Sequence, residues 1–156
     1  MRYNLGDDMK KSIVLFGFCL SVLTGWSSEG WMTDFEGAKK KAATENKVLL
    51  LDFSGSDWCS WCIKLDEEVF QKDAWKAYAK DHLVQVLIDF PRDKSEQSEV
   101  LQKQNNELAK QYAVRGFPTV LLLNQEGALI EKTGYQRGGT ENYIVHIKEL
   151  IGAAEK

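Results

Sequence analysis

Two cysteines separated by two residues are the feature of this sequence with the clearest chemical meaning. Cys59 and Cys62 enclose Ser60 and Trp61 in the run W-C-S-W-C. On a helix, positions i and i+3 place their Cβ atoms about 5–6 Å apart, so a small adjustment is enough to close a disulfide. The spacing therefore predicts a pair that forms and breaks a disulfide reversibly.

A helix that begins near Cys59 would give the two thiols different reactivity. Cys62, Leu65 and Val69 follow at the spacing of one buried helical stripe. Unpaired N–H groups and the helix dipole favour an anion at the helix start, so Cys59 is expected to be the attacking thiolate. It would form a mixed disulfide with a target, and Cys62, held as a thiol by burial, would then release the reduced target. The reverse steps would insert a disulfide.

The sequence offers weaker support for other uses of the pair. A zinc site needs about four ligands, and the two histidines, His82 and His146, lie far apart and are expected at the surface or in helix contacts. A c-type haem site needs a histidine directly after the second cysteine, where Ile63 stands. A structural clip would close too small a loop to remove much entropy from the unfolded chain, while chance spacing stays open. We expect no metal and no cofactor.

The elements predicted around the cysteine pair alternate between helix and strand. Thr33 and Glu36 have the spacing of a capping box, and Asp73 and Thr140 are of types that cap helices. The last two strands are expected to pair as a hairpin, and the whole order predicts an α/β fold with a mixed central sheet and helices on both faces. Apolar periodicity predicts helices that start near residues 33, 59, 99 and 140, a further helical turn at 73, and strands at 48–53, 83–90, 119–124 and 128–133.

The N-terminal segment has the pattern of a secretory signal peptide. Two lysines precede a charge-free apolar run at residues 13–23, and small residues follow it. The run is too short to span a bilayer as a helix, which takes about 20 apolar residues. We expect residues 1–27 to be cleaved and residues 28–156 to remain as the mature domain. The alternative is a buried helix at the start of the domain.

Composition and charge narrow the function classes. A chain of 156 residues with 44% hydrophobic and 28% charged residues is typical of one globular domain. The net charge of -3 gives no basic surplus to neutralise phosphates, so no nucleic-acid partner is expected. Three cysteines are too few for a small disulfide-held scaffold.

Motifs far apart in the sequence together resemble a known family. The strand and turn V-L-L-L-D-F-S-G-S-D-W-C-S-W-C is followed at a distance by V-R-G-F-P-T, by the hairpin arm G-A-L-I and by a capped last helix. From about Thr33 to the C-terminus the chain is similar to the thioredoxin superfamily, in particular to its secreted, DsbH-type periplasmic branch. The resemblance implies a thioredoxin-like fold for residues 28–156, with a proline loop beside the dithiol.

The resemblance assigns redox roles to three residues. Cys59 matches the family's nucleophile and Cys62 its resolving cysteine. Asp52 resembles the buried acid behind the resolving cysteine; a carboxylate in an apolar strand has a raised pKa and could accept the proton of Cys62. Asp52 lies one residue further from Cys59 than in thioredoxin, and Gln85 stands where a lysine often accompanies the acid. The alternative for Asp52 is a solvated residue at a strand end or a turn cap.

The resemblance also implies a surface that contacts the substrate. Pro118 matches the family's cis-proline, and a cis bond there would leave the backbone of Phe117 free to pair with an extended substrate segment. Trp58 matches the tryptophan before the nucleophile and would form part of this surface, with plain core contact as the alternative. Ser60 and Trp61, expected in the same surface, replace a Gly-Pro pair and help set the thiolate pKa and the redox potential.

These features together predict a periplasmic thiol:disulfide oxidoreductase. The resemblance implies a monomeric reductase of disulfides in extracytoplasmic proteins, supplied with electrons by a membrane thiol protein of the DsbD kind. An oxidase or isomerase of the same fold remains possible, because the direction depends on the redox potential. A non-catalytic module that holds a client through Trp58 and the proline loop is a second alternative. Cu(I) binding by the two thiolates is a third.

Overall fold

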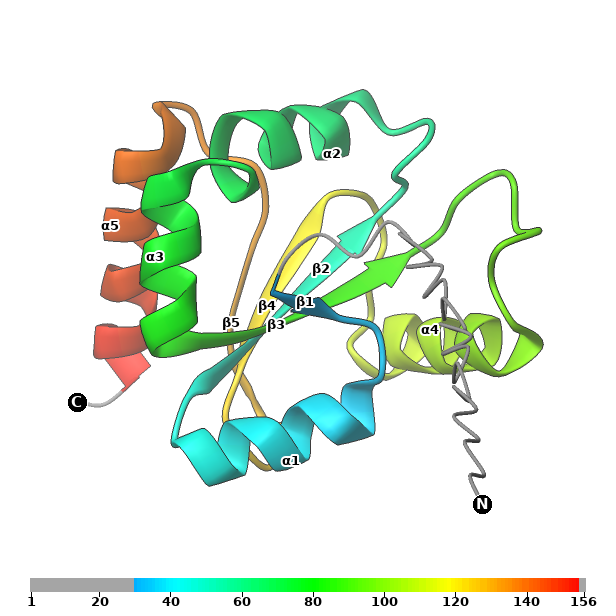
Figure 1. The fold of residues 1–156 in the computed structure, drawn as a ribbon, viewed down its shortest axis with the longest axis horizontal. Coiled ribbons are helices and arrows are strands. Elements are labelled where there is room, and N and C mark those ends of the chain that lie inside the picture. The colour runs from blue at the N-terminus through cyan, green and yellow to red at the C-terminus, as the bar shows by residue number, and fades with distance from the viewer. Residues whose placement is uncertain (1–29, 155–156) are drawn as a thin grey trace, which may run out of the picture.

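A computed structural model describes residues 30–154 of the chain, and the predicted signal peptide at 1–27 lies outside them. Helices and strands alternate along these residues, as the sequence predicts (Figure 1). In chain order the elements are β1 (Trp31–Met32), α1 (Phe35–Glu45), β2 (Val48–Ser54), α2 (Ser60–Leu65), the π-helix η1 (Asp66–Phe70), α3 (Asp73–His82), β3 (Leu83–Asp89), α4 (Glu99–Gln111), β4 (Thr119–Leu123), β5 (Leu129–Thr133) and α5 (Gly139–Ala154).

The five strands form one mixed sheet in the order β1-β3-β2-β4-β5. β2 lies at the centre, pairing in parallel with β3 and antiparallel with β4. β4 and β5 form the predicted hairpin. β1 was not predicted, because its two residues, paired in parallel with Gln85 and Val86, are too few to show a period.

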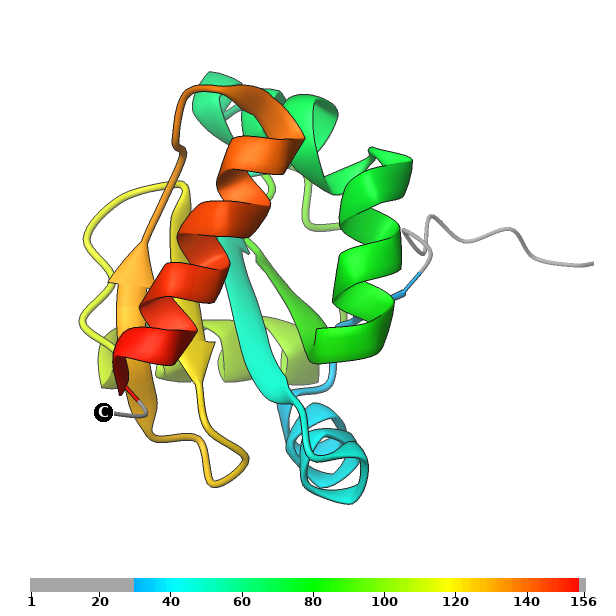
Figure 2. The same ribbon diagram turned by 90° about the vertical axis from the view of Figure 1, so that its left-hand side faces the viewer.

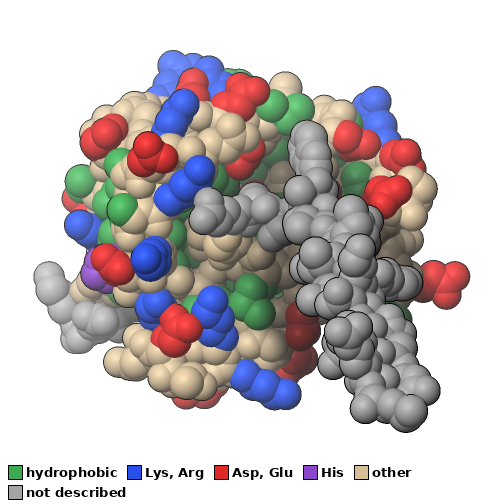
Figure 3. All heavy atoms as spheres, viewed as in Figure 1, with side chains coloured by type: hydrophobic (Ala, Val, Ile, Leu, Met, Phe, Trp, Pro, Cys, Tyr) green, Lys and Arg blue, Asp and Glu red, His purple; other side chains and the backbone are tan. Residues whose placement is uncertain are grey.

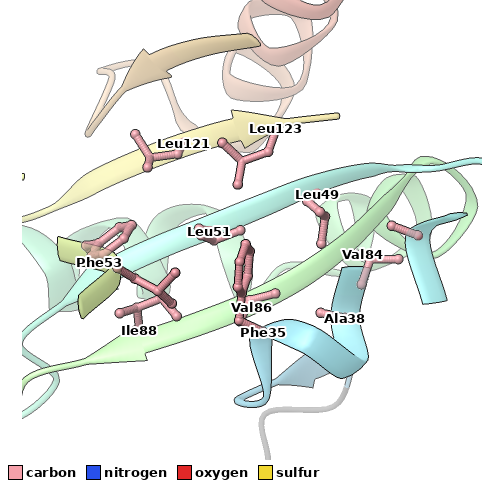
Figure 4. Close-up of a cluster of buried hydrophobic side chains, with 12 residues drawn as sticks. Phe35, Ala38, Leu49, Leu51, Phe53, Val84, Val86, Ile88, Leu121 and Leu123 are labelled. Atoms are coloured by element: carbon pink, nitrogen blue, oxygen red, sulfur yellow. The ribbon is translucent and has the colours of Figure 1, made fainter. Parts of the chain in front are cut away.

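Helices cover both faces of this sheet. Side chains alternate along a strand, so Leu49, Leu51 and Phe53 of β2 point to one face and Leu50 points to the other. We call the face covered by α1 and α4 the first face, and the face covered by α2, η1, α3 and α5 the second face (Figure 1). Figure 4 shows the core of the first face, in which Phe35 of α1 meets aliphatic side chains of β2, β3 and β4.

Aromatic side chains dominate the core of the second face. Phe70, Trp75 and Tyr143 contact one another with ring centroids 5.1 to 6.0 Å apart. The indole N–H of Trp75 donates to Gln85 of β3 at 2.7 Å, so this buried polar atom is satisfied. Tyr143 and Ile147 of α5 are fully buried here, and α5 lies beside α3 (Figures 1 and 2).

The predicted helix at the cysteines exists and is divided in two. Cys62, Leu65 and Val69 are buried as one stripe, as the spacing predicts. After Leu65 the chain widens into η1, which ends with the N–H of Gln71 bonded to the carbonyl of Asp66 at 2.9 Å. A one-turn π-helix leaves little trace in hydrophobic spacing, and the sequence did not indicate it.

Two predicted helix caps are wrong by one residue. Asp34, not Thr33, caps α1, and its carboxylate accepts the N–H of Gly37 at 3.1 Å. Aspartate caps as well as threonine does, so the neighbouring residue takes the role. Asp73 is the first residue of α3 rather than its cap, and the expected single turn extends to ten residues.

Thr140 is also not a cap. Because α5 already begins at Gly139, Thr140 lies within its first turn. Its hydroxyl donates instead to the backbone carbonyl of Glu68 in η1 at 2.8 Å. This bond ties the start of α5 to the helical segment that carries the cysteines.

The surface of the described residues carries mixed charge. Figure 3 shows lysine and arginine side chains interspersed with aspartate and glutamate on one face of the molecule. Within residues 30–154, no helix has the length and hydropathy that a membrane crossing would need.

Candidate active site

Strand register brings the cysteine pair and the proline loop to the same end of the sheet. β2 ends at Ser54 and leads through a short loop to Cys59. Phe53 of β2 pairs with Thr119 of the antiparallel β4, so Pro118 comes next to Ser54. The loop before β4 therefore lies at the end of β2 from which the cysteines follow.

The two cysteines form a disulfide at the start of α2. Their Cα atoms are 5.2 Å apart. Cys59 occupies the N-cap position, and its Sγ accepts the backbone N–H of Cys62 at 3.2 Å. Both side chains are mostly buried, with 7% of Cys59 and 3% of Cys62 exposed. A thiolate on Cys59 would meet a donor N–H already in place, which favours the charged form.

The loop before Cys59 is fixed by polar bonds to the loop after β3. The carboxylate of Asp57 accepts the backbone N–H groups of Arg92 at 2.9 Å and Asp93 at 3.2 Å. The first of these bonds is the main reason why the pKa of Asp57 is lowered. Ser56 Oγ donates to Asp89 at 2.6 Å. These bonds hold the segment that presents Cys59.

Trp58 and Phe117 are brought together beside the disulfide. Their rings meet edge to face at 5.8 Å, and Phe90 lies 5.3 Å from Phe117. The indole N–H of Trp58 donates to the carbonyl of Phe90 at 2.8 Å, and 39% of Trp58 remains exposed. We call these three residues the Trp58 cluster. Sequence reasoning missed Phe90, although its position after the parallel strand β3 places it at the same sheet end as Cys59.

The proline loop borders an open hollow. The Phe117–Pro118 peptide bond is cis, as the resemblance implies. The hydroxyl of Thr119 donates to the carbonyl of Gly116 at 2.8 Å and closes the loop. The hollow has a volume of about 590 Å³ and is lined by Ala113, Arg115, Gly116, Phe117, Pro118, Thr119 and Lys132.

The residues between the cysteines reach solvent. Ser60 is the first residue of α2 and is exposed. Trp61 is 49% exposed, and its ring contacts Tyr135 in the loop after β5 at 5.2 Å. Lys64 and Glu68 complete this contact, and we call the four residues Trp61, Lys64, Glu68 and Tyr135 the Trp61 cluster. No pattern in the sequence singled out Tyr135, because an irregular loop carries no period.

Asp52 is buried, and because it alternates with Leu51 and Phe53 along β2 it points to the second face. Only 5% of it is exposed, and its Oδ1 has no hydrogen-bond partner within residues 30–154. Burial raises the pKa of Asp52 to about 8, and the carboxylates of Asp66 and Asp89 add to the effect. A carboxyl group with this pKa exchanges its proton near neutral pH, which suits a general acid or base.

The remaining candidates from the sequence have contacts of their own. Gln85 bonds Trp75 in the second-face core. The ring of His82 lies 4.7 Å from that of Tyr78, and His146 shares a hydrogen bond of 2.9 Å with Thr133. In the described part of the chain, no three His, Cys, Asp or Glu side chains come together as metal ligands would.

Comparison with known proteins agrees with this geometry. Residues 35–142 match the family model of a thioredoxin-like domain. The chain is 36% identical over 114 residues to the disulfide bond reductase DsbH of Chlamydia pneumoniae, an alignment that covers 73% of this chain and 68% of the relative.

Solved structures give the same result. A DsbH oxidoreductase superposes with a TM-score of 0.74 at 34% identity, over 78% of this chain and 83% of that one. A thioredoxin from Thermus thermophilus shares the fold alone, with a TM-score of 0.57 at 17% identity over 81% of this chain and 88% of that one. The chain therefore belongs to the thioredoxin-like family of thiol:disulfide oxidoreductases.

Proposed function

We propose that this protein is a periplasmic reductase of disulfides in extracytoplasmic proteins. The observation that carries the proposal is the Cys59–Cys62 disulfide at the start of α2, with an exposed tryptophan directly before each cysteine. The similarity to a disulfide bond reductase supports the direction. Export by residues 1–27 and a monomeric state are parts of the same proposal.

The first step is the attack of Cys59 on the client. In the reduced protein, the thiolate of Cys59 attacks one sulfur of the client disulfide. A mixed disulfide forms between Cys59 and the client, and the other client sulfur leaves as a thiolate that takes up a proton. The N–H of Cys62, which bonds Cys59 Sγ at 3.2 Å, stabilises the thiolate before attack.

The second step releases the client. Cys62 loses its proton to the carboxylate of Asp52, and its thiolate attacks Cys59 Sγ. The Cys59–Cys62 disulfide forms, and the second client sulfur leaves as a thiolate. The client has gained two electrons and this protein has lost two. A membrane thiol donor of the DsbD kind would return them and reduce the pair again.

Cysteine variants test the oxidoreductase mechanism. With insulin as client and dithiothreitol as reductant, we expect the domain to accelerate insulin reduction and Cys59→Ser to abolish the acceleration. Cys62→Ser should accumulate a mixed disulfide, seen as a covalent adduct in non-reducing gels and mass spectra. A module that only holds clients would accelerate nothing, and Cys59→Ser would bind the client as well as the wild type does.

The reduction potential tests the direction. Equilibration of residues 28–156 with glutathione and dithiothreitol buffers, followed by thiol trapping, gives the potential of the cysteine pair. A reductase should lie near thioredoxin, at about -270 mV, whereas a value near that of DsbA, about -120 mV, would make the protein an oxidase.

A further inference from the structure

We propose that Tyr135 is a positioning residue that fixes Trp61 as a subsite for an apolar side chain of the client, next to the client's disulfide. This inference rests on the proposed function and adds to it the chemical class of the client segment. Tyr135 lies in the loop between β5 and α5, far in sequence from the cysteines. Its contacts connect that loop to Trp61, the residue just before Cys62.

Ring, cation and hydrogen-bond contacts hold the Trp61 cluster together. The rings of Trp61 and Tyr135 lie 5.2 Å apart at 46° to each other. The ammonium of Lys64 lies over both rings, 5.5 Å from the Trp61 centroid and 5.7 Å from the Tyr135 centroid. The hydroxyl of Tyr135 donates to Glu68 at 2.6 Å. An exposed tryptophan with a ring neighbour and a cation on its face loses much of its rotamer freedom.

The cluster is anchored at both ends. Glu68 lies in η1, and its backbone carbonyl accepts the hydroxyl of Thr140 from α5 at 2.8 Å. The hydrogen bond from Tyr135 is the main reason why the pKa of Glu68 is lowered. Tyr135 itself packs against the second-face core. The loop after β5 therefore cannot move far from the helix that carries Trp61 without breaking these bonds.

The charge of the cluster indicates an apolar client rather than a charged one. Lys64 pairs with Glu68 at 3.5 Å, so the cation over the ring is offset by an anion. The large apolar group of the cluster that remains accessible is Trp61, 49% of which is exposed. A half-exposed indole held in place gains most from covering by an aliphatic or aromatic side chain.

The Trp58 cluster has different supports and serves as an internal comparison. Trp58 bonds Phe90 and contacts Phe117, and Arg92 lies 5.9 Å from its ring. Its partners come from the loops after β3 and before β4, whereas Tyr135 follows β5. If Tyr135 acts through Trp61, its replacement should affect Trp61-dependent recognition and leave Trp58-dependent recognition intact.

The test measures the activity of the full mature domain on three disulfide substrates. Two disulfide-linked peptides are identical except that both residues flanking the reactive cysteine are Phe in one and Ser in the other. Hydroxyethyl disulfide, which has no side chains, reports the dithiol chemistry alone. We expect the wild type to reduce the Phe peptide with a kcat/KM about three- to tenfold higher than the Ser peptide, a ratio expected for one aromatic contact.

Tyr135→Leu should bring the ratio of kcat/KM between the Phe and Ser peptides close to one, through a higher KM for the Phe peptide. The rate with hydroxyethyl disulfide should stay unchanged. Tyr135→Phe, which keeps the ring, should keep most of the preference. Trp61→Leu should lose the preference for the Phe peptide in the same way. Its position is exposed and tolerates the change, so this variant keeps the test valid if Tyr135→Leu does not fold.

A double-mutant cycle separates positioning from general damage. The effects of Tyr135→Leu and Trp61→Leu on the Phe preference should be non-additive, because the two side chains form one unit. The effects of Tyr135→Leu and Trp58→Leu should multiply to within about a factor of two. Additivity with Trp61, or an equal loss on all three substrates, overturns the proposal. A wild type inactive on all three substrates would instead overturn the proposed function.

Discussion

The carboxyl group of Asp52, which we propose accepts the proton of Cys62, also makes the stability of the fold depend on pH. Burial raises its pKa from 3.8 to about 8. Between these values the folded chain holds a proton that the unfolded chain has lost, so the stability that this group contributes is full below about pH 4 and disappears as the pH rises through 8. A charge-neutral replacement should therefore matter most at high pH.

Replacement of Asp52 tests this dependence. In Asp52→Asn we expect the free energy of unfolding of the oxidised domain to rise by about 2–4 kcal/mol at pH 8 and to change little at pH 4. Urea unfolding at both pH values measures the difference. The second step of client reduction should slow in the same variant, since the amide cannot accept the proton of Cys62.

Asp57→Asn is the matched control for that experiment. Asp57 has a lowered pKa because it accepts backbone N–H groups, chiefly that of Arg92. Its contribution to stability is present above the unfolded pKa and is lost as the pH falls, which is the opposite sign. Equal stabilisation of the two variants at pH 8 would contradict the role of burial at Asp52.

At the scale of elements, the segment just after β5 passes close to the backbone of the proline loop. A Cβ on Gly134, which follows β5, would lie 2.9 Å from the carbonyl oxygen of Pro118. A Cβ on Gly116, in the same loop as Pro118, would meet nothing within 4 Å. The two glycines therefore differ in the space around them and not in chemistry.

Alanine substitutions at these glycines give a paired prediction. Gly134→Ala should lower the free energy of unfolding by about 1–3 kcal/mol, because two backbone segments must separate. Gly116→Ala should change it by less than about 0.5 kcal/mol. Urea unfolding of both variants measures the difference. Equal free energies of unfolding would mean that the segment after β5 can move away from Pro118 without loss of stability.

The success of sequence reasoning at this scale depended on what each element buries. Strands with continuous apolar runs and helices with a buried stripe were predicted correctly, because core contact fixes both their period and their location. Caps were misplaced by one residue at Thr33, where the adjacent Asp34 caps instead, and at Asp73, where α3 begins one residue earlier than expected and has no side-chain cap. β1 and η1 are held by tertiary contacts and carry no period of their own.

The same distinction applies to the candidate site, where residues in motifs were predicted and residues brought close only by the fold were not. Cys59, Cys62 and Pro118 were predicted from motifs, and strand register explains why the cysteine pair and the proline loop lie at the same end of the sheet. Phe90 and Tyr135 were missed because their proximity to Trp58 and Trp61 arises from the folded arrangement of loops. Local spacing carries no information about such contacts.

At the scale of the whole molecule, the first 27 residues give a prediction about location. We expect residues 1–27, fused to alkaline phosphatase that is active only outside the cytoplasm, to give phosphatase activity in a bacterial host. In this prediction the apolar run at 13–23 is the export signal. Leu15→Arg, which places a charge within that run, should abolish the activity. Equal activity of both fusions would contradict the signal peptide.

The two tryptophan clusters belong to different layers of the molecule. Phe90 and Phe117 pack against the first-face core, whereas Tyr135 packs against the second-face core. Each cluster is therefore supported by a separate set of core residues, on opposite faces of the sheet. If both clusters contact the client as we propose, client preference at one cluster can diverge during evolution, or be redesigned, without repacking the core behind the other, which would make the two surfaces modular.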